Sequence, residues 1–151
     1  MRNNRKAISP VIATIIIVAV AIVMSIAVAY WLMGLGTVFT RYERLEIPVA
    51  YAEKKGSDWN VTLHVKNTGS SDATINIILL NGKLDSQAAV RVDGKGYGNL
   101  GNATLNISVE AGGYKELIIE LSGGKYRSGQ SVEITLQTAA GYQYPKSVVL
   151  P

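Results

Sequence analysis

The first forty residues contain one long apolar run. No charged residue occurs from Ala7 to Thr40, and residues 8–35 are almost entirely Ile, Val, Ala, Leu and Met. On a helix drawn through this run, apolar side chains fall on every side, so that no face suits water. The pattern predicts a helix over residues 8–40 that must be enclosed by lipid or by other helices.

This predicted helix is longer than a membrane crossing requires. Its 33 residues would extend about 50 Å, whereas the hydrocarbon core of a bilayer is about 30 Å thick. An ordinary secretory signal has an apolar part of only ~7–15 residues, which the run exceeds. Three basic residues, Arg2, Arg5 and Lys6, precede it. By the positive-inside rule they predict a cytoplasmic N-terminus, with residues 41–151 on the outside.

Beyond residue 40 the hydrophobic period becomes that of β-strands. From Trp59 to Lys66 apolar and polar residues alternate, as in a strand with one buried face. Turn sequences rich in Gly, Asn and Asp separate about eight such segments. The predicted strands cover residues 45–52, 59–66, 74–80, 88–92, 104–109, 114–121, 132–138 and 144–150. Short strands with glycine-rich turns favour an antiparallel, immunoglobulin-like β-sandwich over residues 41–151, and the fold class is therefore α+β.

Charge and composition narrow the function. The chain has 151 residues, no cysteine, one histidine and a formal net charge of +4. Three of its 15 basic residues and none of its 11 acids lie in residues 1–7, so that residues 8–151 carry 12 basic against 11 acidic groups. The nearly neutral remainder gives no indication of a nucleic-acid partner. Missing cysteines exclude disulfides, thiolate catalysis and cysteine-ligated metals.

The junction before the apolar run resembles a known processing signal. The residues Arg5-Lys6-Ala7, followed by Ile8-Ser9-Pro10-Val11-Ile12-Ala13, resemble the class III signal peptide of archaeal type IV pilins. The resemblance covers about the first 35 residues. It implies that a membrane-embedded prepilin peptidase cleaves between Ala7 and Ile8, so that Lys6, Ala7 and Ile8 form the processing site. It further implies extraction by an assembly ATPase and platform, which packs the helices into a filament core.

One position departs from the wider type IV pilin pattern. Bacterial pilins usually carry glutamate at the fifth residue after the cleavage point, where this chain has Ile12. Archaeal members commonly lack that glutamate, so its absence favours the archaeal branch. A second, weaker resemblance joins residues 61–69 to a strand and turn of archaeal pilin and archaellin outer domains.

Three asparagines lie in N-x-S/T sequons. These are Asn60, Asn102 and Asn106. The strand alternation turns Asn60 and Asn106 away from their apolar neighbours, and we expect all three side chains to reach solvent on an exported domain. We predict N-glycosylation at one or more of them, although sequons also arise by chance as ordinary polar strand positions.

Other motifs have simpler explanations. Residues 96–101 match GxGxxG, but a strand-like segment follows where a dinucleotide site needs a helix, so a flexible loop is expected there. His64 has no second histidine with which to share a metal, and a solvated position is expected. Glu110, Glu116, Glu120 and Glu133 are expected on the sandwich surface, and no nucleophile–base pair can be named. We therefore expect neither an enzyme nor a cofactor or metal site.

Two classes of function follow. The first is a structural subunit of an extracellular archaeal type IV pilus, a helical homopolymer used for adhesion, which resides in the cell membrane before assembly. Within this class an archaellum subunit for motility remains an alternative. The second is a monomeric, membrane-anchored β-sandwich that binds a ligand or receptor.

Overall fold

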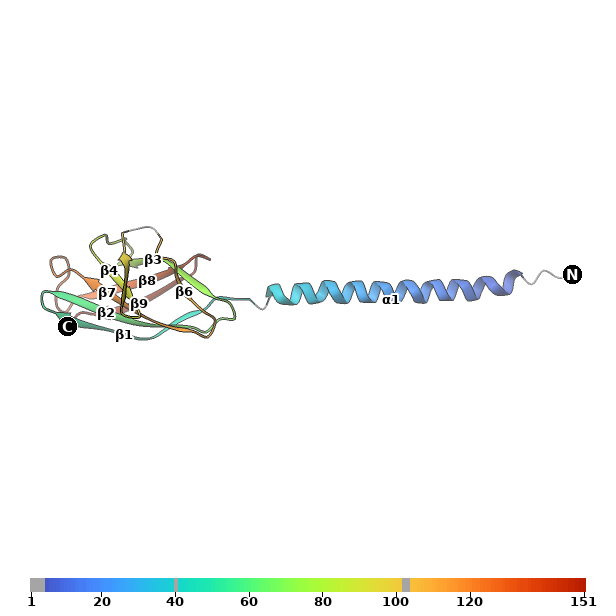
Figure 1. Cartoon of the computed structure of the whole chain (residues 1–151), viewed down its shortest axis with the longest axis horizontal. Helices are drawn as coiled ribbons and strands as arrows, with labels where there is room; N and C mark the ends of the chain where they lie inside the picture. Colours follow the sequence, from blue (N-terminus) through green and yellow to red (C-terminus); the bar gives the residue numbers. More distant parts are fainter. Residues whose placement is uncertain (1–4, 40, 102–103) are drawn as a thin grey trace. The chain divides into compact units, whose positions relative to one another are not determined.

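The apolar run forms one continuous helix, α1, over Arg5–Phe39 (Figure 1). The structure is a computed structural model that describes residues 5–39, 41–101 and 104–151. The helix begins three residues before the expected start at Ile8, and it continues through Gly34 and Gly36 without a break. Residues 1–41 and residues 42–151 form separate units, close to the boundary that the sequence predicts after residue 40.

Two polar side chains of α1 form hydrogen bonds within the helix itself. The Thr14 hydroxyl donates to the Val11 carbonyl at 2.8 Å, and the Ser25 hydroxyl donates to the Ala21 carbonyl at 2.7 Å. A hydroxyl that bonds its own helix needs no water, because its donor is already paired. Both hydroxyl groups therefore keep a hydrogen-bond acceptor when α1 lies in an apolar environment.

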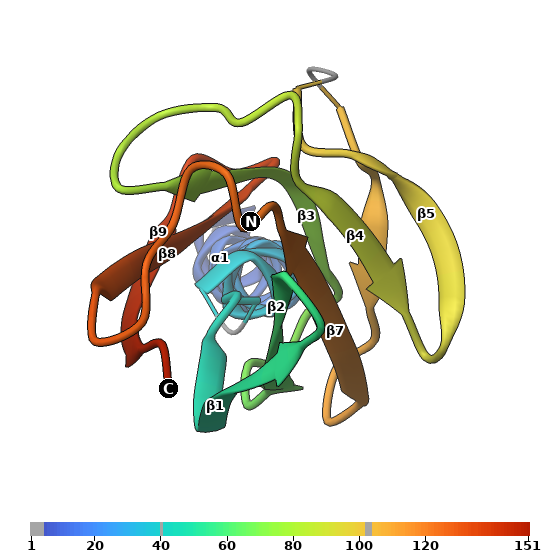
Figure 2. The ribbon, with the colours of Figure 1, turned by 90° about the vertical axis from the view of Figure 1, so that its left-hand side faces the viewer.

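Residues 42–151 form two antiparallel sheets, confirming the predicted β-sandwich. The first sheet has the strand order β1-β2-β7-β4-β5 and the second has the order β6-β3-β8-β9. The strands are β1 Leu45–Lys55, β2 Asp58–Asn67, β3 Ala73–Leu80, β4 Ala89–Val92, β5 Lys95–Asn99, β6 Ile107–Val109, β7 Tyr114–Leu121, β8 Ser131–Thr138 and β9 Gln143–Val149. Figure 2 shows the two layers facing each other, with β1 and β9 bordering the same side.

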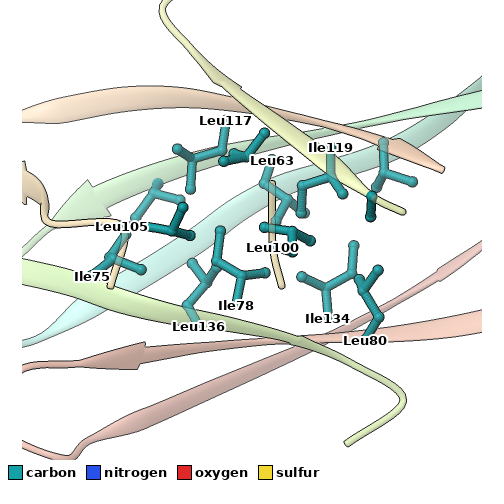
Figure 3. Packing of buried hydrophobic residues seen from close by; sticks show 14 of the residues in the cluster. Leu63, Ile75, Ile78, Leu80, Leu100, Leu105, Leu117, Ile119, Ile134 and Leu136 are labelled. Carbon is teal, nitrogen blue, oxygen red and sulfur yellow. The ribbon is translucent and has the colours of Figure 1, made fainter. Parts of the chain in front are cut away.

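One hydrophobic core fills the space between the sheets. Leu63 of β2 and Leu117 of β7 face Ile78 of β3 and Leu136 of β8, and all four side chains are fully buried (Figure 3). The apolar positions of the alternating pattern are therefore the side chains that face the core. Burying a side chain of this size stabilises the fold by about 1.5–3 kcal/mol. All members of this core belong to residues 42–151, which therefore have a core of their own.

Two details of the strands differ from the prediction. The GxGxxG segment, expected to be a flexible loop, contributes β5, which pairs with β4 across the turn Asp93-Gly94. Both turn residues have positive φ, 49° and 79°, as the tight hairpin turn requires. The expected strand 104–109 shortens to β6, because Asn106 has a φ of 51° that extended backbone does not allow.

The chain that enters β1 is bonded to the turn after β2. The amide of Thr68 donates to the Arg44 carbonyl at 2.8 Å, and the amide of Ser70 donates to the Tyr42 carbonyl at 3.0 Å. Gly69 lies so close to this segment that a Cβ at residue 69 would overlap the Tyr42 carbonyl oxygen. A glycine is therefore required at this crossing.

Asn67 holds the same turn from inside the sandwich. Its side chain is completely buried. The amide nitrogen Nδ2 donates to the carbonyls of Ser71 at 2.8 Å and Val109 at 3.0 Å, while Oδ1 accepts from the Gly69 amide at 2.9 Å. One side chain thus connects the ends of β2 and β6 and fixes the turn that is hydrogen-bonded to the segment before β1.

Candidate functional site

Most of the exposed large apolar side chains of the described residues lie on α1. A stretch of 27 residues, Pro10–Gly36, is long and apolar enough to cross a membrane, and its most apolar 18 residues have a mean hydropathy of 3.1; a signal sequence meets the same criteria. The large apolar side chains from Val11 to Met33, Ile12 and Val23 among them, are between 50% and 74% exposed on the single chain. Such a surface needs a covering of lipid or of other apolar helices.

The predicted processing site lies in the first turns of this helix. Lys6, Ala7 and Ile8 have helical backbone, but their side chains lie outside the described residues. Pro10 is the sixth residue of α1. Cleavage between Ala7 and Ile8 remains a prediction.

The three sequon asparagines have different surroundings. Asn106 is exposed, directly before β6, and its carbonyl accepts a hydrogen bond of 2.8 Å from the Tyr97 hydroxyl. Asn60 is half-buried in β2, opposite Glu53 of β1 and Glu120 of β7. Asn102 lies outside the described residues. The alternation correctly places Asn60 and Asn106 off the core, but of these two only Asn106 is freely exposed.

We predict more complete N-glycosylation at Asn106 than at Asn60. A transferase has to reach the side-chain amide, and strands on both sides restrict access to Asn60 once the sandwich has formed. Glycopeptide mass spectrometry of protein from the native host measures occupancy at each site, with Asn106→Gln as the control that removes the signal. Higher occupancy at Asn60 than at Asn106 would contradict this ranking.

The single histidine is less solvated than the sequence suggested. His64 lies half-buried between two tyrosines, with ring centroids 6.4 Å from Tyr51 and 5.3 Å from Tyr114, both edge to face. Its Nε2 is 3.7 Å from a carboxylate oxygen of Glu116. This outer-face cluster joins β1, β2 and β7, and aromatic cross-strand contacts of this kind stabilise a sheet.

Two of the four expected surface acids have structural partners. Glu116 faces His64, and Glu120 forms an ion pair of 2.9 Å with Arg91, whereas Glu110 and Glu133 are exposed. Across residues 5–39, 41–101 and 104–151, no group of three His, Asp or Glu side chains is placed to hold a metal. The GxGxxG segment lies in a strand and a turn, so it has no helix N-terminus with which to bind a phosphate.

The buried carboxylate of Asp85 connects the loop between β3 and β4 to the loop between β7 and β8. Asp85 Oδ2 accepts hydrogen bonds of 2.8 Å from both the Lys125 ammonium and the buried Tyr126 hydroxyl, and Oδ1 accepts from the Gln87 amide. Burial by itself raises the pKa of Asp85, but these three donors outweigh it and lower the net pKa below its ordinary value. Burial, together with Asp85, raises the pKa of Tyr126 far above its ordinary value.

The lowered pKa of Asp85 predicts a loss of stability in acid. A carboxyl whose pKa is lower in the folded chain stabilises it above the unfolded pKa of about 4, and this contribution disappears as the pH falls through the folded pKa. Asp85→Asn should cost about 1–3 kcal/mol at pH 7 and should flatten the acid dependence.

Asp93 provides a matched control for this prediction. Its pKa is lowered as well, chiefly by a hydrogen bond from Lys115, but the pair is exposed. Asp93→Asn, which suits the positive φ at this position, should therefore have the smaller effect. Urea unfolding between pH 2 and pH 7 measures both variants, and equal effects would refute the role assigned to Asp85.

Comparison of the chain with protein-family models and with curated proteins finds no match. Sequence reasoning missed two groups: the Asn67 anchor and the Asp85–Lys125–Tyr126 cluster. Asn67 lies in an evident turn sequence, Asn67-Thr68-Gly69, so its position could have been recognised from the sequence. The Asp85 cluster joins residues 40 positions apart, and no local sequence pattern indicates it.

Proposed function

We propose that the chain is a structural subunit of an extracellular filament of the archaeal type IV pilus class. The observation that carries this proposal is the surface of Pro10–Gly36, where no side chain is buried and apolar side chains occupy every side of the helix. A helix that only crosses a bilayer needs about 20 residues. The additional length and the apolar surface suit a helix that first spans a membrane and afterwards packs against identical helices.

The second support is the self-sufficiency of residues 42–151. Their buried core extends from Leu45 to Leu150, and all of its members belong to residues 42–151. An outer domain that needs no contact from α1 for its core can stay folded while α1 exchanges lipid for protein neighbours. Adhesion is the use we propose for the filament, with the sandwich displayed on its surface and the motility filament as an alternative within the same class.

Processing belongs to the same proposal. The basic residues before α1 and the junction Ala7-Ile8 resemble the class III signal, so a prepilin peptidase would remove residues 1–7. Intact-mass measurement of protein isolated from filaments tests this step. A mass that includes residues 1–7 would contradict the cleavage without affecting the packing of α1.

Removal of residues 8–29 tests assembly. We expect the shortened chain to form no filaments by electron microscopy, whereas circular dichroism still reports a folded sandwich, because the core lies outside the deleted segment. As a control, the full-length chain expressed in cells that lack the native gene should restore filaments. Filaments formed by the shortened chain would defeat the proposed assembly mechanism, whereas a full-length chain that forms no filaments would favour a monomeric anchored binding module.

A further inference from the structure

We infer that a groove on the outer face of the first sheet binds a saccharide. The inference deepens the proposed function, because it names the chemical class that an adhesive filament would contact. The groove has a volume of about 360 Å³ and lies where β1, β2, β7 and β4 approach the loops after residues 55, 80 and 121. Its polar lining consists of Lys55, Asp58, Asn60, Gln87, Glu120 and Ser122.

The sheet register explains why these side chains converge. Asn60 of β2 is directly opposite Glu120 of β7, which in turn is opposite Ala89 of β4. Lys55 pairs with Asp58 where β1 turns into β2. These positions come from four different strands, and their meeting depends on the placement of β7 between β2 and β4.

Part of the lining is held in place, and part is free to bind. Glu120 is fixed by its 2.9 Å ion pair with Arg91, and Asp58 Oδ1 accepts from the Gly123 amide at 2.9 Å. Within the described residues, the side-chain amides of Asn60 and Gln87 have no hydrogen-bond partner. Two unused amides beside two positioned carboxylates form a partly preorganised polar site.

The mixture of donors and acceptors suits sugar hydroxyls. Each hydroxyl donates and accepts at once, and an amide offers both functions while a carboxylate accepts and an ammonium donates. Ala89 adds a small apolar surface beside Glu120 for the carbon-bound hydrogens of a sugar ring. An apolar ligand would leave these polar groups without partners, and an anion would meet the carboxylates of Asp58 and Glu120.

The saccharide has two possible sources with the same chemistry. Asn60 is itself a sequon asparagine, so a glycan linked to it would have its first sugar in the groove. An unmodified Asn60 leaves the groove open to a free saccharide. Without an aromatic platform, one groove should bind only at millimolar concentration, and repetition along a filament would raise the overall avidity.

Protein made in a host without N-glycosylation tests binding to the bare groove. The isotope-labelled full chain is kept in a zwitterionic detergent, which has no sugar headgroup, and is titrated with lactose and with diacetylchitobiose while amide NMR shifts are followed. We expect shifts at groove residues, and an affinity about five-fold weaker in Gln87→Ala, which loses one neutral hydrogen-bonding group. Gln143→Ala, an exposed strand position away from the groove, is the matched control.

Three results would overturn the inference. They are the absence of groove shifts in a chain with a native spectrum, equal effects of Gln87→Ala and Gln143→Ala, and a stronger response to inorganic phosphate than to either sugar. Given binding, glycopeptide analysis of native protein identifies the source, since a sugar on Asn60 means the chain's own glycan and an unmodified Asn60 means a free one. Filaments that assemble but bind no saccharide overturn only this inference, whereas a saccharide-binding chain that forms no filaments overturns only the proposed function.

Discussion

Replacing Asn67 by alanine should destabilise the β-sandwich by roughly 3–5 kcal/mol, a large part of the 5–15 kcal/mol typical of a domain. The substitution removes three hydrogen bonds at once, to the carbonyls of Ser71 and Val109 and from the amide of Gly69. A buried group left without a partner costs about 1–3 kcal/mol, because water cannot replace the lost bond.

Chemical unfolding of residues 42–151 measures this effect. Trp59 is buried, and it is the only tryptophan in that segment, so its fluorescence reports unfolding of the sandwich. Asn99→Ala, on the exposed strand β5, removes the same side chain without a buried partner and should change the free energy of unfolding by less than about 0.5 kcal/mol. Similar values for the two variants would show that Asn67 is not a structural anchor.

Replacing Ile22 by aspartate should abolish filaments and still leave the chain inserted in membranes. Ile22 lies near the middle of Pro10–Gly36. The 13 Ile, Val and Leu side chains of residues 8–33 favour insertion by roughly 6 kcal/mol, and one central aspartate costs about 3 kcal/mol, so insertion stays favourable. In a bundle of identical helices, each subunit would instead bury an unpaired carboxylate against apolar neighbours, at a cost of several kcal/mol per subunit.

Carbonate extraction of membranes and electron microscopy of whole cells separate the two effects. Ile22→Leu is the matched control, because it keeps the volume and the apolar character, and it should yield normal filaments. A chain with aspartate at this position that stays in the membrane fraction without filaments agrees with the proposed assembly. Normal filament yield from Ile22→Asp would show that α1 is not packed inside a polymer.

Most elements were predictable because their pattern is local. The strands around Leu63 and Leu117 show an alternation that any sheet with one buried face must have. Strand β5 was missed, since Gly96 and Gly98 have no side chains and thus leave no periodic signal. The strand predicted through Asn106 was too long, because one residue with positive φ ends extended structure without changing the hydrophobic pattern.

Exposure was harder to predict than secondary structure. Thr62 has a polar side chain on the outer face, and yet it is only 6% exposed. It lies on a central strand, directly opposite Tyr51 of β1 on one side and Ile118 of β7 on the other, and both neighbours have larger side chains. His64 is half-buried for the same reason. A sequence shows which face a residue takes, but the covering depends on which strands become neighbours.

The sequence by itself determined the division of this chain into an apolar helix and a sandwich, because both follow from periodicities within a few residues. It also located the three sequons and the pilin-like junction at Ala7-Ile8. Only the tertiary structure decided that Asn67 is an anchor, that Asp85 meets Lys125, and that a sequon asparagine lies in a polar groove. These contacts join residues about 40 or more positions apart, and their partners are chosen by strand order, which no local pattern encodes.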